Sequence, residues 1–346
     1  MQLSEFNFPF DSSLIATEPV LPREQARLLV LRPGDRSITH RRIADLPDLL
    51  TPGDLLVVND TRVRPARIKG RKRSGKSVDI LFVKAVGDRD WEVLMKGTWR
   101  AGEVIDVDPD ARLTVLVREA GRTVVRIDGT VPIMKWFQTY GCMPLPPYIK
   151  RAPTDEDREW YQTVFAREEG AIAAPTAGLH FTPALLTRLA ERRIELANVT
   201  LHVGVGTFRP VTVDRIEEHR MEPEHVEVGP ETVRAIEDAK QRRGKIVAVG
   251  TTVVRALESA ASGPGTLRAY QGETRLFIVP GYRFQIVEAL LTNFHLPQTT
   301  LLMLVSAFGG TDVLREAYDE AVRRRYRFYS YGDAMLVAGR EPSSAG

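Results

Sequence analysis

The stretch Ile172 to Thr182, IAAPTAGLHFT, combines small residues, a proline, a glycine and a histidine directly before a predicted helix. Thr182 is the expected N-cap of that helix, and a proline follows it at the first helical position. The loop at 175–181 therefore lies where backbone N–H groups point outward, and Gly178 lets the chain pass close to a ligand. We expect a binding loop with His180 as a proton-transfer group. The alternative is a tight turn in which His180 pairs only with a neighbouring carbonyl.

Three later stretches also place glycine, hydroxyl or amide groups at the end of a predicted strand. They are GVGTFR at 204–209, GTT at 250–252 and NFH at 293–295. Open α/β sheets collect ligands where strand ends gather, so we expect these stretches and the 175–181 loop to converge on one pocket that holds His180 and His295. The TT pair opens a predicted helix whose N–H groups favour a carboxylate or phosphate, although an N-capped helix without a ligand would have the same sequence.

Asp60 follows the apolar run DLLVV at 54–58, which is predicted to be a buried strand, as is EQARLLVLR at 24–32. Polar residues at the end of such a strand often contact ligands in α/β proteins. Asp60 is therefore a candidate carboxylate, with a turn or a helix cap as the alternative.

A basic stretch covers residues 62–76, RVRPARIKGRKRSGK, and contains no acidic residue. Its eight Lys and Arg residues give a local charge of +8, which favours a phosphate backbone as partner; a solvated loop is the alternative. Near the C-terminus, RRRYRFYSYGDAML at 323–336 interleaves arginines with aromatic residues. Such a pattern is typical of a surface that stacks bases, and also of an edge strand with a basic face.

Residues 78–128 change character, with five short β-rich runs separated by turn signals and no helical period. This spacing predicts a small antiparallel barrel or sandwich. Helical patterns resume only after PLPPY at 144–148. We therefore predict an α/β main domain, residues 1–62 plus 151–346, interrupted by an inserted small antiparallel β-barrel domain at 63–150.

The composition is that of a soluble globular protein, with 346 residues, 43% hydrophobic and 27% charged, and a net charge of +3. The single Cys142 excludes an intramolecular disulfide and fits a reducing compartment. His and Glu cluster at 217–228, but Pro223 interrupts the helical spacing of a zinc site, so no metal is predicted. The N-terminus has no basic start and no long apolar run, which predicts a cytoplasmic protein without a signal peptide or membrane span.

Seven segments carry a family resemblance: NDTRVRPARI, PLPPYI, AAPTAGLHFT, LHVGVGTFRPV, VGTTVVRALES, TNFHLPQTTLLMLVSAF and YRFYSYGDAML. In order, and over nearly the whole chain, they resemble the S-adenosylmethionine:tRNA ribosyltransferase-isomerases of queuosine biosynthesis. The resemblance implies an α/β domain with an inserted β-barrel. One departure is that family members read MHxEY where this chain has Met221, Glu222, Pro223, Glu224 and His225: the acid at Glu224 is kept, but Glu222 replaces the histidine and His225 the tyrosine.

The resemblance implies that S-adenosylmethionine is a cosubstrate that donates ribose, and that no cofactor is bound permanently. The family transfers and isomerises the ribosyl group onto 7-aminomethyl-7-deazaguanine at the wobble position of a tRNA with a GUN anticodon. The products are epoxyqueuosine, adenine and methionine. A monomer without a metal or a membrane partner is expected.

This reaction determines which groups the site must contain. The sulfonium acidifies the neighbouring ribose carbon, so a base must take its proton; adenine must be protonated or hydrogen-bonded to leave; and the amine must lose a proton. The catalytic candidates are His180, His295, Glu224 and Asp60, with acid and base unassigned among them, and His202 is a further imidazole. Phe181 or Phe208 is a candidate contact for the sulfonium, and Thr251 with Thr252 for the methionyl carboxylate.

The full set of expected substrate contacts is Pro175, Thr176, Gly178, Phe181, His202, Gly206, Thr207, Phe208, Arg209, Thr251, Thr252 and Asn293. The expected tRNA contacts are Arg62, Arg67, Arg71, Lys72, Arg73 and Arg327.

Two other classes explain part of the sequence. A nucleotide-transforming enzyme that does not use RNA would account for the VGTT helix start but not for the basic stretch. A non-catalytic RNA-binding protein would account for the basic stretch but not for the polar strand-end loops. Whether adenine release from S-adenosylmethionine requires modified tRNA separates both from the family that the chain resembles.

Overall fold

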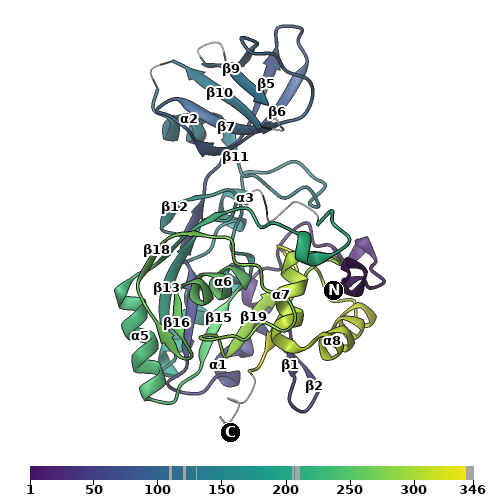
Figure 1. The fold of residues 1–346 in the computed structure, drawn as a ribbon, viewed down its shortest axis with the longest axis vertical. Helices are drawn as coiled ribbons and strands as arrows, with labels where there is room; N and C mark the ends of the chain where they lie inside the picture. The colour runs from purple at the N-terminus through teal and green to yellow at the C-terminus, as the bar shows by residue number, and fades with distance from the viewer. Residues whose placement is uncertain (109–110, 120–121, 130, 205, 207–210, 340–346) are drawn as a thin grey trace. The chain divides into compact units, whose positions relative to one another are not determined.

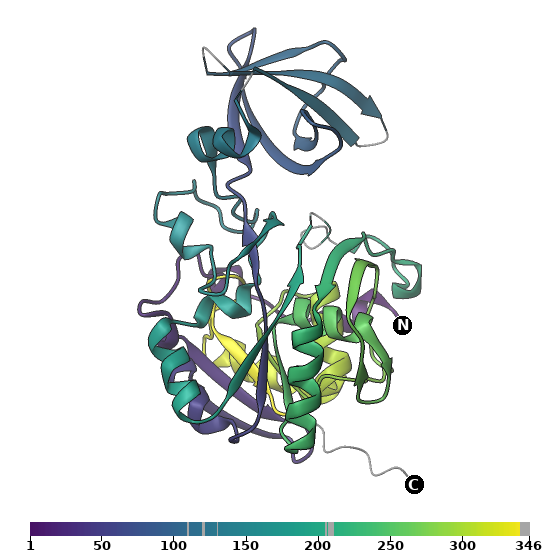
Figure 2. The same cartoon turned by 90° about the vertical axis from the view of Figure 1, so that its left-hand side faces the viewer.

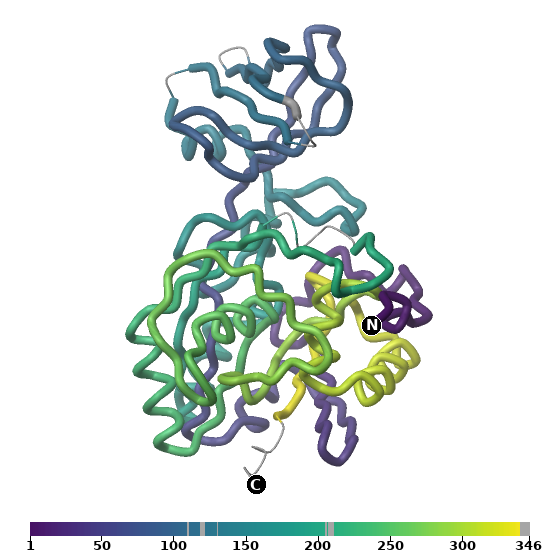
Figure 3. The backbone as a smooth tube through the Cα atoms, viewed as in Figure 1, coloured from purple at the N-terminus to yellow at the C-terminus, as the bar shows by residue number. Residues whose placement is uncertain are grey.

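The structure is a computed structural model that describes residues 1–108, 111–119, 122–129, 131–204, 206 and 211–339. The chain forms two compact units, and its path through both is drawn in Figure 1 and as a tube in Figure 3. Unit 1 comprises Met1–Arg62, Pro147–Lys150 and Gln162–Gly346, and unit 2 comprises Val63–Pro146 and Arg151–Tyr161. The first boundary coincides with the predicted one. At the second, residues 147–150 group with unit 1 and residues 151–161 with unit 2, so the chain enters unit 2 twice.

Unit 1 is built on a nine-stranded sheet with the order β18-β14-β13-β3-β15-β19-β20-β1-β2. β13, β3, β15 and β19 are parallel neighbours at its centre. β14 and β20 run antiparallel to the strands at either side of this group, and β1 is parallel to β20. The strands are β1 (Arg27–Arg32), β2 (Ser37–Arg42), β3 (Leu55–Asn59), β13 (Glu195–Leu201), β14 (Glu224–Val228), β15 (Ile246–Val249), β18 (Tyr270–Thr274), β19 (Ala289–Asn293) and β20 (Ala334–Val337).

Both faces of this sheet are covered, because alternate residues of each central strand point to opposite sides. On one face Leu290 of β19 belongs to a core cluster shared with α5 (Pro230–Gln241), α6 (Thr251–Ala260), α7 (Thr300–Gly309) and α8 (Thr311–Arg323). On the other face Leu291 belongs to a cluster shared with α1 (Leu46–Leu49) and α4 (Pro183–Glu191). Figure 2 shows the sheet between these two sets of helices. Strand ends are therefore the part of the sheet that remains open to ligands.

Unit 2 is a closed antiparallel β-barrel. Its strand order is β11-β5-β6-β7-β10-β9-β8, and pairing of β8 with β5 closes the barrel. The strands are β5 (Arg67–Lys72), β6 (Ser77–Ala85), β7 (Asp90–Met95), β8 (Val104–Asp108), β9 (Ala111–Glu119), β10 (Arg122–Asp128) and β11 (Gly141–Cys142), with helices α2 (Ile133–Tyr140) and α3 (Asp157–Trp160). An α/β domain with an inserted small antiparallel barrel, the predicted fold class, is confirmed.

The basic stretch contains a strand, since Arg67–Lys72 forms β5; Ile68 and Gly70 face the barrel interior while Lys69 between them points outward. A Cβ at Gly70 would lie 2.6 Å from the Ile105 side chain, so the interior has room only for glycine. Helical structure also resumes earlier than predicted, at α2, and residues 23–25 form a 3₁₀ turn before β1.

Shorter elements complete the described chain. They are the 3₁₀ turns η1 (Leu3–Phe6), η2 (Ser12–Leu14), η3 (Arg23–Gln25), η4 (Ile43–Asp45), η5 (Thr176–His180) and η7 (Ile216–Glu218), and the strands β4 (Thr61–Val63), β12 (Glu168–Ala171), β16 (Ala261–Gly263) and β17 (Thr266–Leu267). Among helices in the described ranges, none combines the length and apolar character that a membrane span needs.

Candidate functional site

The carboxyl ends of β13, β3, β15 and β19 lie at one edge of the sheet, because these strands are parallel neighbours. The antiparallel strands β14 and β20 begin at the same edge, where Leu201 pairs with Val226 and Asn293 with Ala334. This edge therefore brings together residues that are distant in sequence. It carries His202, Asp60, Thr251, Asn293, Glu224 and Asp333.

Asn59 joins three of these strand ends. Its Nδ2 donates to the carbonyl of Leu201 at 3.0 Å and to Oγ1 of Thr252 at 3.3 Å, while its Oδ1 accepts the N–H groups of Thr61 and Leu201. Thr61 in turn contacts Nδ1 of His202 through its hydroxyl at 2.7 Å. The ends of β3 and β13 and the start of α6 are therefore fixed relative to one another.

His202 lies against the backbone of Gly170. A Cβ at that position would be 2.5 Å from Nε2 of the imidazole, so only glycine permits this approach. The His202 ring also stacks on His225 of β14, with centroids 5.6 Å apart. His202 is thus held on three sides, by Thr61, by Gly170 and by His225.

The 175–181 loop forms the turn η5, which packs against β19 and η3. Ala177 contacts Gly250 at the start of α6, and Gly178 has the side chain of Thr163 only 3.0 Å from where its own Cβ would be. Thr182 accepts the N–H of Leu185 at 3.2 Å and caps α4, which confirms the predicted helix start. Pro175 and Thr176 begin the turn.

His180 is buried, with 5% of its surface exposed, and its Nε2 has no partner among the described residues. Burial lowers its pKa to about 4, against a smaller opposing effect from Asp333. The imidazole is therefore neutral near pH 7. Phe181 next to it is fully buried and packs edge-on against Phe165, which favours a core role over contact with a sulfonium.

His295 is equally buried, and burial lowers its pKa to about 3. Its Nε2 lies 2.9 Å from Oγ1 of Thr292, and its backbone N–H donates to the hydroxyl oxygen of Tyr318 at 3.0 Å. Thr292 is on the same face of β19 as Leu290, whereas η5 packs on the opposite face. The two imidazoles thus reach the edge from different sides, and their shared pocket stays a prediction.

Glu224 and Arg255 form a buried ion pair at the same edge. The other oxygen of Glu224 accepts the N–H of Gly204 at 3.1 Å, and Arg255 donates to the carbonyl of Leu276 at 3.0 Å. Nη2 of Arg255 is buried and has no partner within the described ranges. Sequence reasoning missed Arg255; the available signal was one arginine inside the otherwise apolar run TTVVRAL.

A cavity of about 430 Å³ adjoins Glu224. This volume is within the range of small-molecule sites, roughly 300–1,000 Å³. Its lining includes Gly204, Gly206, His219, Arg220, Glu222 and Glu224. Two expected site residues, Gly206 and Glu224, therefore share one cavity.

Asp60 is placed differently from the histidines. Its carboxylate accepts hydrogen bonds from Oγ1 of Thr200 at 2.7 Å and from Nη2 of Arg167 at 2.8 Å. Burial raises its pKa, although Thr200 and Arg167 act in the opposite direction. It lines a cavity of about 230 Å³ with Glu227 and other residues of β13, β14 and α5. Both oxygens are occupied, which favours a structural role.

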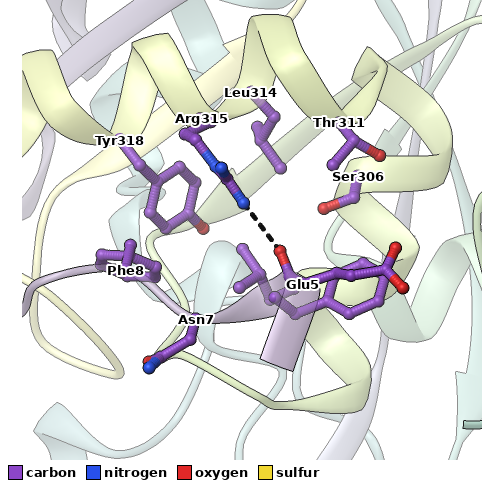
Figure 4. Close-up of a pocket in the computed structure, with 10 residues that line it drawn as sticks. Glu5, Asn7, Phe8, Ser306, Thr311, Leu314, Arg315 and Tyr318 are labelled. Carbon is purple, nitrogen blue, oxygen red and sulfur yellow. Dashed lines mark hydrogen bonds between the residues drawn. The ribbon is translucent and has the colours of Figure 1, made fainter. Parts of the chain in front are cut away.

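Figure 4 shows a third cavity, where the N-terminal segment crosses α7 and α8. Arg315 donates to the carbonyl of Glu5 at 2.9 Å, and the rings of Phe8 and Tyr318 pack edge to face beside it, with centroids 5.1 Å apart. Its volume of about 30 Å³ holds about one water molecule and excludes a nucleotide. Tyr318 also accepts a hydrogen bond from the His295 backbone, so the N-terminal segment packs against a residue that positions the His295 turn.

Residues 3–337 match the family model described as queuosine biosynthesis protein. The chain belongs to this family. It is 49% identical over 347 residues to the S-adenosylmethionine:tRNA ribosyltransferase-isomerase of Xanthomonas oryzae pv. oryzae, an alignment that covers 98% of each chain. It is 48% identical to the protein of the same name from Aquifex aeolicus, with 97% of this chain and 100% of the relative covered. The names of these relatives are those of enzymes, and this chain is an enzyme as well.

A solved structure also matches over nearly the whole chain. The S-adenosylmethionine tRNA ribosyltransferase of Thermotoga maritima is 37% identical, and the match covers 96% of this chain and 100% of that one with a TM-score of 0.56. In the part of this queuosine biosynthesis protein that the structure describes, no group of three or more His, Cys, Asp or Glu side chains is arranged to hold a metal ion.

The basic residues expected to contact tRNA fall into two groups. Arg67 pairs with Asp79, and Lys72 pairs with Glu103 and lies 3.6 Å above the ring of Trp99. Arg71 and Arg73 are exposed and make no ion pair with described residues. The acids that partner this stretch come from neighbouring strands, so the local charge is lower than +8.

Five expected contact residues remain to be placed. Arg62 is exposed and donates to the carbonyl of Ala166 at 3.4 Å. Arg327 donates to the carbonyls of Glu18 and Tyr331, which favours a structural role. Thr207, Phe208 and Arg209 lie outside the described residues.

Proposed function

We propose that this chain transfers and isomerises the ribosyl group of S-adenosylmethionine onto 7-aminomethyl-7-deazaguanine at the wobble position of a tRNA with a GUN anticodon. The products are epoxyqueuosine, adenine and methionine. The observation that carries the proposal is that Nε2 of His180 and Oδ1 of Asn293 are buried at the sheet edge with no hydrogen-bond partner among the described residues. Buried polar groups are nearly always hydrogen-bonded, so such atoms favour contact with a substrate. The protein acts as a cytoplasmic monomer without a permanently bound cofactor.

His180 is the first candidate for the base. A base must be unprotonated and able to reach its proton. The His180 imidazole is neutral, and its Nε2 has no partner in the described ranges, so that nitrogen is available. His295 is a positioning residue, since its Nε2 contacts Thr292 and its backbone is held by Tyr318. Asp60 and Glu224 both have partners on each carboxylate oxygen.

The methionyl end of S-adenosylmethionine is assigned to the start of α6. Thr251 and Thr252 open this ten-residue helix, whose first N–H groups favour a carboxylate. Glu222, which lines the neighbouring cavity, is the candidate acid for the ammonium group. Adjacent strands lie about 4.8 Å apart, so the edge from β19 to β13 spans about 14 Å, which suits an extended nucleoside joined to an amino acid.

Incubation with S-adenosylmethionine and tRNA that carries the aminomethyl base, followed by nucleoside mass analysis, tests the proposal. Epoxyqueuosine and an equal amount of free adenine are expected. The matched control is the same tRNA with unmodified guanine, which should give neither product. Adenine release that does not depend on modified tRNA, or a methylated nucleoside in place of a ribosylated one, would contradict the proposal.

A further inference from the structure

Tyr329 has an unusual backbone conformation beside the end of β19. Its φ of 69° is in the left-handed region, which bulky residues seldom adopt and which is over-represented at functional sites. Three hydrogen bonds hold it there. The Tyr329 N–H donates to the carbonyl of Phe294 at 3.0 Å, and its own carbonyl accepts from Gly332 and from Nδ2 of Asn293, both at 2.9 Å.

Asn293 is the last residue of β19 and is only 1% exposed. A primary amide carries two N–H groups and a carbonyl oxygen. One N–H of Asn293 donates to Tyr329, but Oδ1 has no partner in the described part of the chain. The amide therefore leaves an acceptor and a second donor side by side. Asn293 lies two residues after Leu291 in β19, so both side chains point to the face of the sheet against which η5 packs. His180, in η5, approaches from that same face.

An aromatic pair adjoins this amide. The rings of Tyr148 and Tyr329 are 3.8 Å apart at their centroids and tilted by 40°. The hydroxyls of Tyr148 and Ser330 are 2.6 Å apart, which fixes Tyr148 relative to the same turn. Both tyrosines are only partly buried. A partly exposed aromatic surface next to a donor–acceptor pair is suited to a purine base, which needs a stacking face and an edge contact.

We propose that Asn293 and Tyr329 form the subsite for the adenine of S-adenosylmethionine, with the ring of Tyr148 packed against that of Tyr329. The adenine 6-amino group donates to Oδ1 of Asn293, and the second N–H of Nδ2 donates to a ring nitrogen beside it. This inference rests on the proposed function, because that function makes adenine the base which is bound and then released. The hydrogen bond to the ring nitrogen also stabilises adenine as a leaving group.

Calorimetric titration of the full-length protein with free adenine, hypoxanthine and guanine tests the subsite without any turnover. Hypoxanthine has an oxygen in place of the 6-amino group, so the wild-type protein should bind adenine at least tenfold more tightly. Asn293→Ala should lose this preference, whereas Asn198→Ala, on the exposed side of β13, should keep it. Tyr329→Phe should retain adenine binding and Tyr329→Leu should weaken it about tenfold. Melting curves establish that each variant is folded.

The outcomes are distinct. No adenine binding by the wild-type protein, a preference for guanine or hypoxanthine, or an unchanged preference in Asn293→Ala would overturn the subsite. Because this titration uses neither tRNA nor S-adenosylmethionine, an adenine preference that depends on Asn293 together with no epoxyqueuosine in the product analysis would reject the proposed function and retain the purine subsite.

Discussion

Glu224 at the start of β14 and Arg255 in α6 form an ion pair whose side chains are only 5% and 7% exposed. The pair joins an edge region of the sheet to the helix that begins at Thr251. Since Glu224 also accepts the N–H of Gly204, it connects three segments that are well separated in sequence. The carboxylate adjoining the 430 Å³ cavity is therefore fixed in orientation by contacts from outside its own strand.

Arg255→Met should lower the free energy of unfolding by about 3–5 kcal/mol, because it leaves the Glu224 carboxylate buried without its cation. The double variant Arg255→Met with Glu224→Gln should recover a large part of that loss. Arg192→Ala is the control, since the Arg192–Asp48 pair is 60% and 55% exposed and is expected to contribute about 1 kcal/mol or less. Urea unfolding measures all three. Equal effects of the buried and exposed arginines would contradict the prediction.

Features that depend on local sequence were predictable. The cap at Thr182 and the start of α6 follow from residue types within one turn of the helix, and both are found at the expected positions. The alternating pattern of β5 was also present in the sequence, but the density of Lys and Arg left a solvated loop as an alternative. Only the barrel shows that Ile68 and Gly70 point inward while the charges point outward.

Contacts between distant segments were not predictable from local patterns. Asp60 looked like a free carboxylate at a strand end, and its partner Arg167 lies more than a hundred positions away. Asp79 in β6 and Glu103 just before β8 are nearer in sequence to Arg67 and Lys72, yet only the barrel brings each acid against its cation. A sequence shows which residues can ionise, but the fold decides which charges are already paired.

Because some basic residues of the barrel already have acidic partners, they should contribute less to tRNA binding than those without one. Arg71→Ala with Arg73→Ala should weaken tRNA binding and reduce its salt slope by about 1.4, taking about 0.7 per lost phosphate contact on a single strand. Arg67→Ala with Lys72→Ala should have a smaller effect, because both cations already have acidic partners. Filter binding between low and high salt gives the slopes, and S-adenosylmethionine affinity should be unchanged. An equal loss of slope in both double variants would show that the ion pairs open on binding.

The two buried histidines make stability depend on pH. Their folded pKa values, about 4 for His180 and about 3 for His295, are below the ordinary 6.5 because burial disfavours the charged imidazole. Below pH 6.5 the unfolded chain therefore binds more protons than the folded one. Stability from the neutral imidazoles is complete above that pH and is lost as pH falls toward 4, by up to about 3 kcal/mol per group. His180→Gln and His295→Gln should each make the decline shallower by about 1.4 kcal/mol per pH unit.

Urea unfolding from pH 7.5 to 4.5 measures this dependence, with each variant compared to the wild type at the same pH. The glutamine side chain keeps a polar group at the site without titrating. Curves for wild type and variants that run parallel over this range would show that neither imidazole is held neutral by the fold.

His180→Ala should lower turnover by about 10²–10⁴-fold at saturating substrates, the usual contribution of a positioned proton-transfer group, with tRNA affinity nearly intact. His295→Gln should lower it by about tenfold or less, since its Nε2 already contacts Thr292 and a glutamine amide can make the same contact.

Exchange in D₂O separates the two roles. If His180 removes the proton from the ribose carbon beside the sulfonium, S-adenosylmethionine recovered from a reaction with modified tRNA should contain deuterium at that carbon. Deuterium uptake should persist in His295→Gln and vanish in His180→Ala. Uptake that survives in His180→Ala, with unaltered turnover, would transfer the role of base to Glu224 or Asp60.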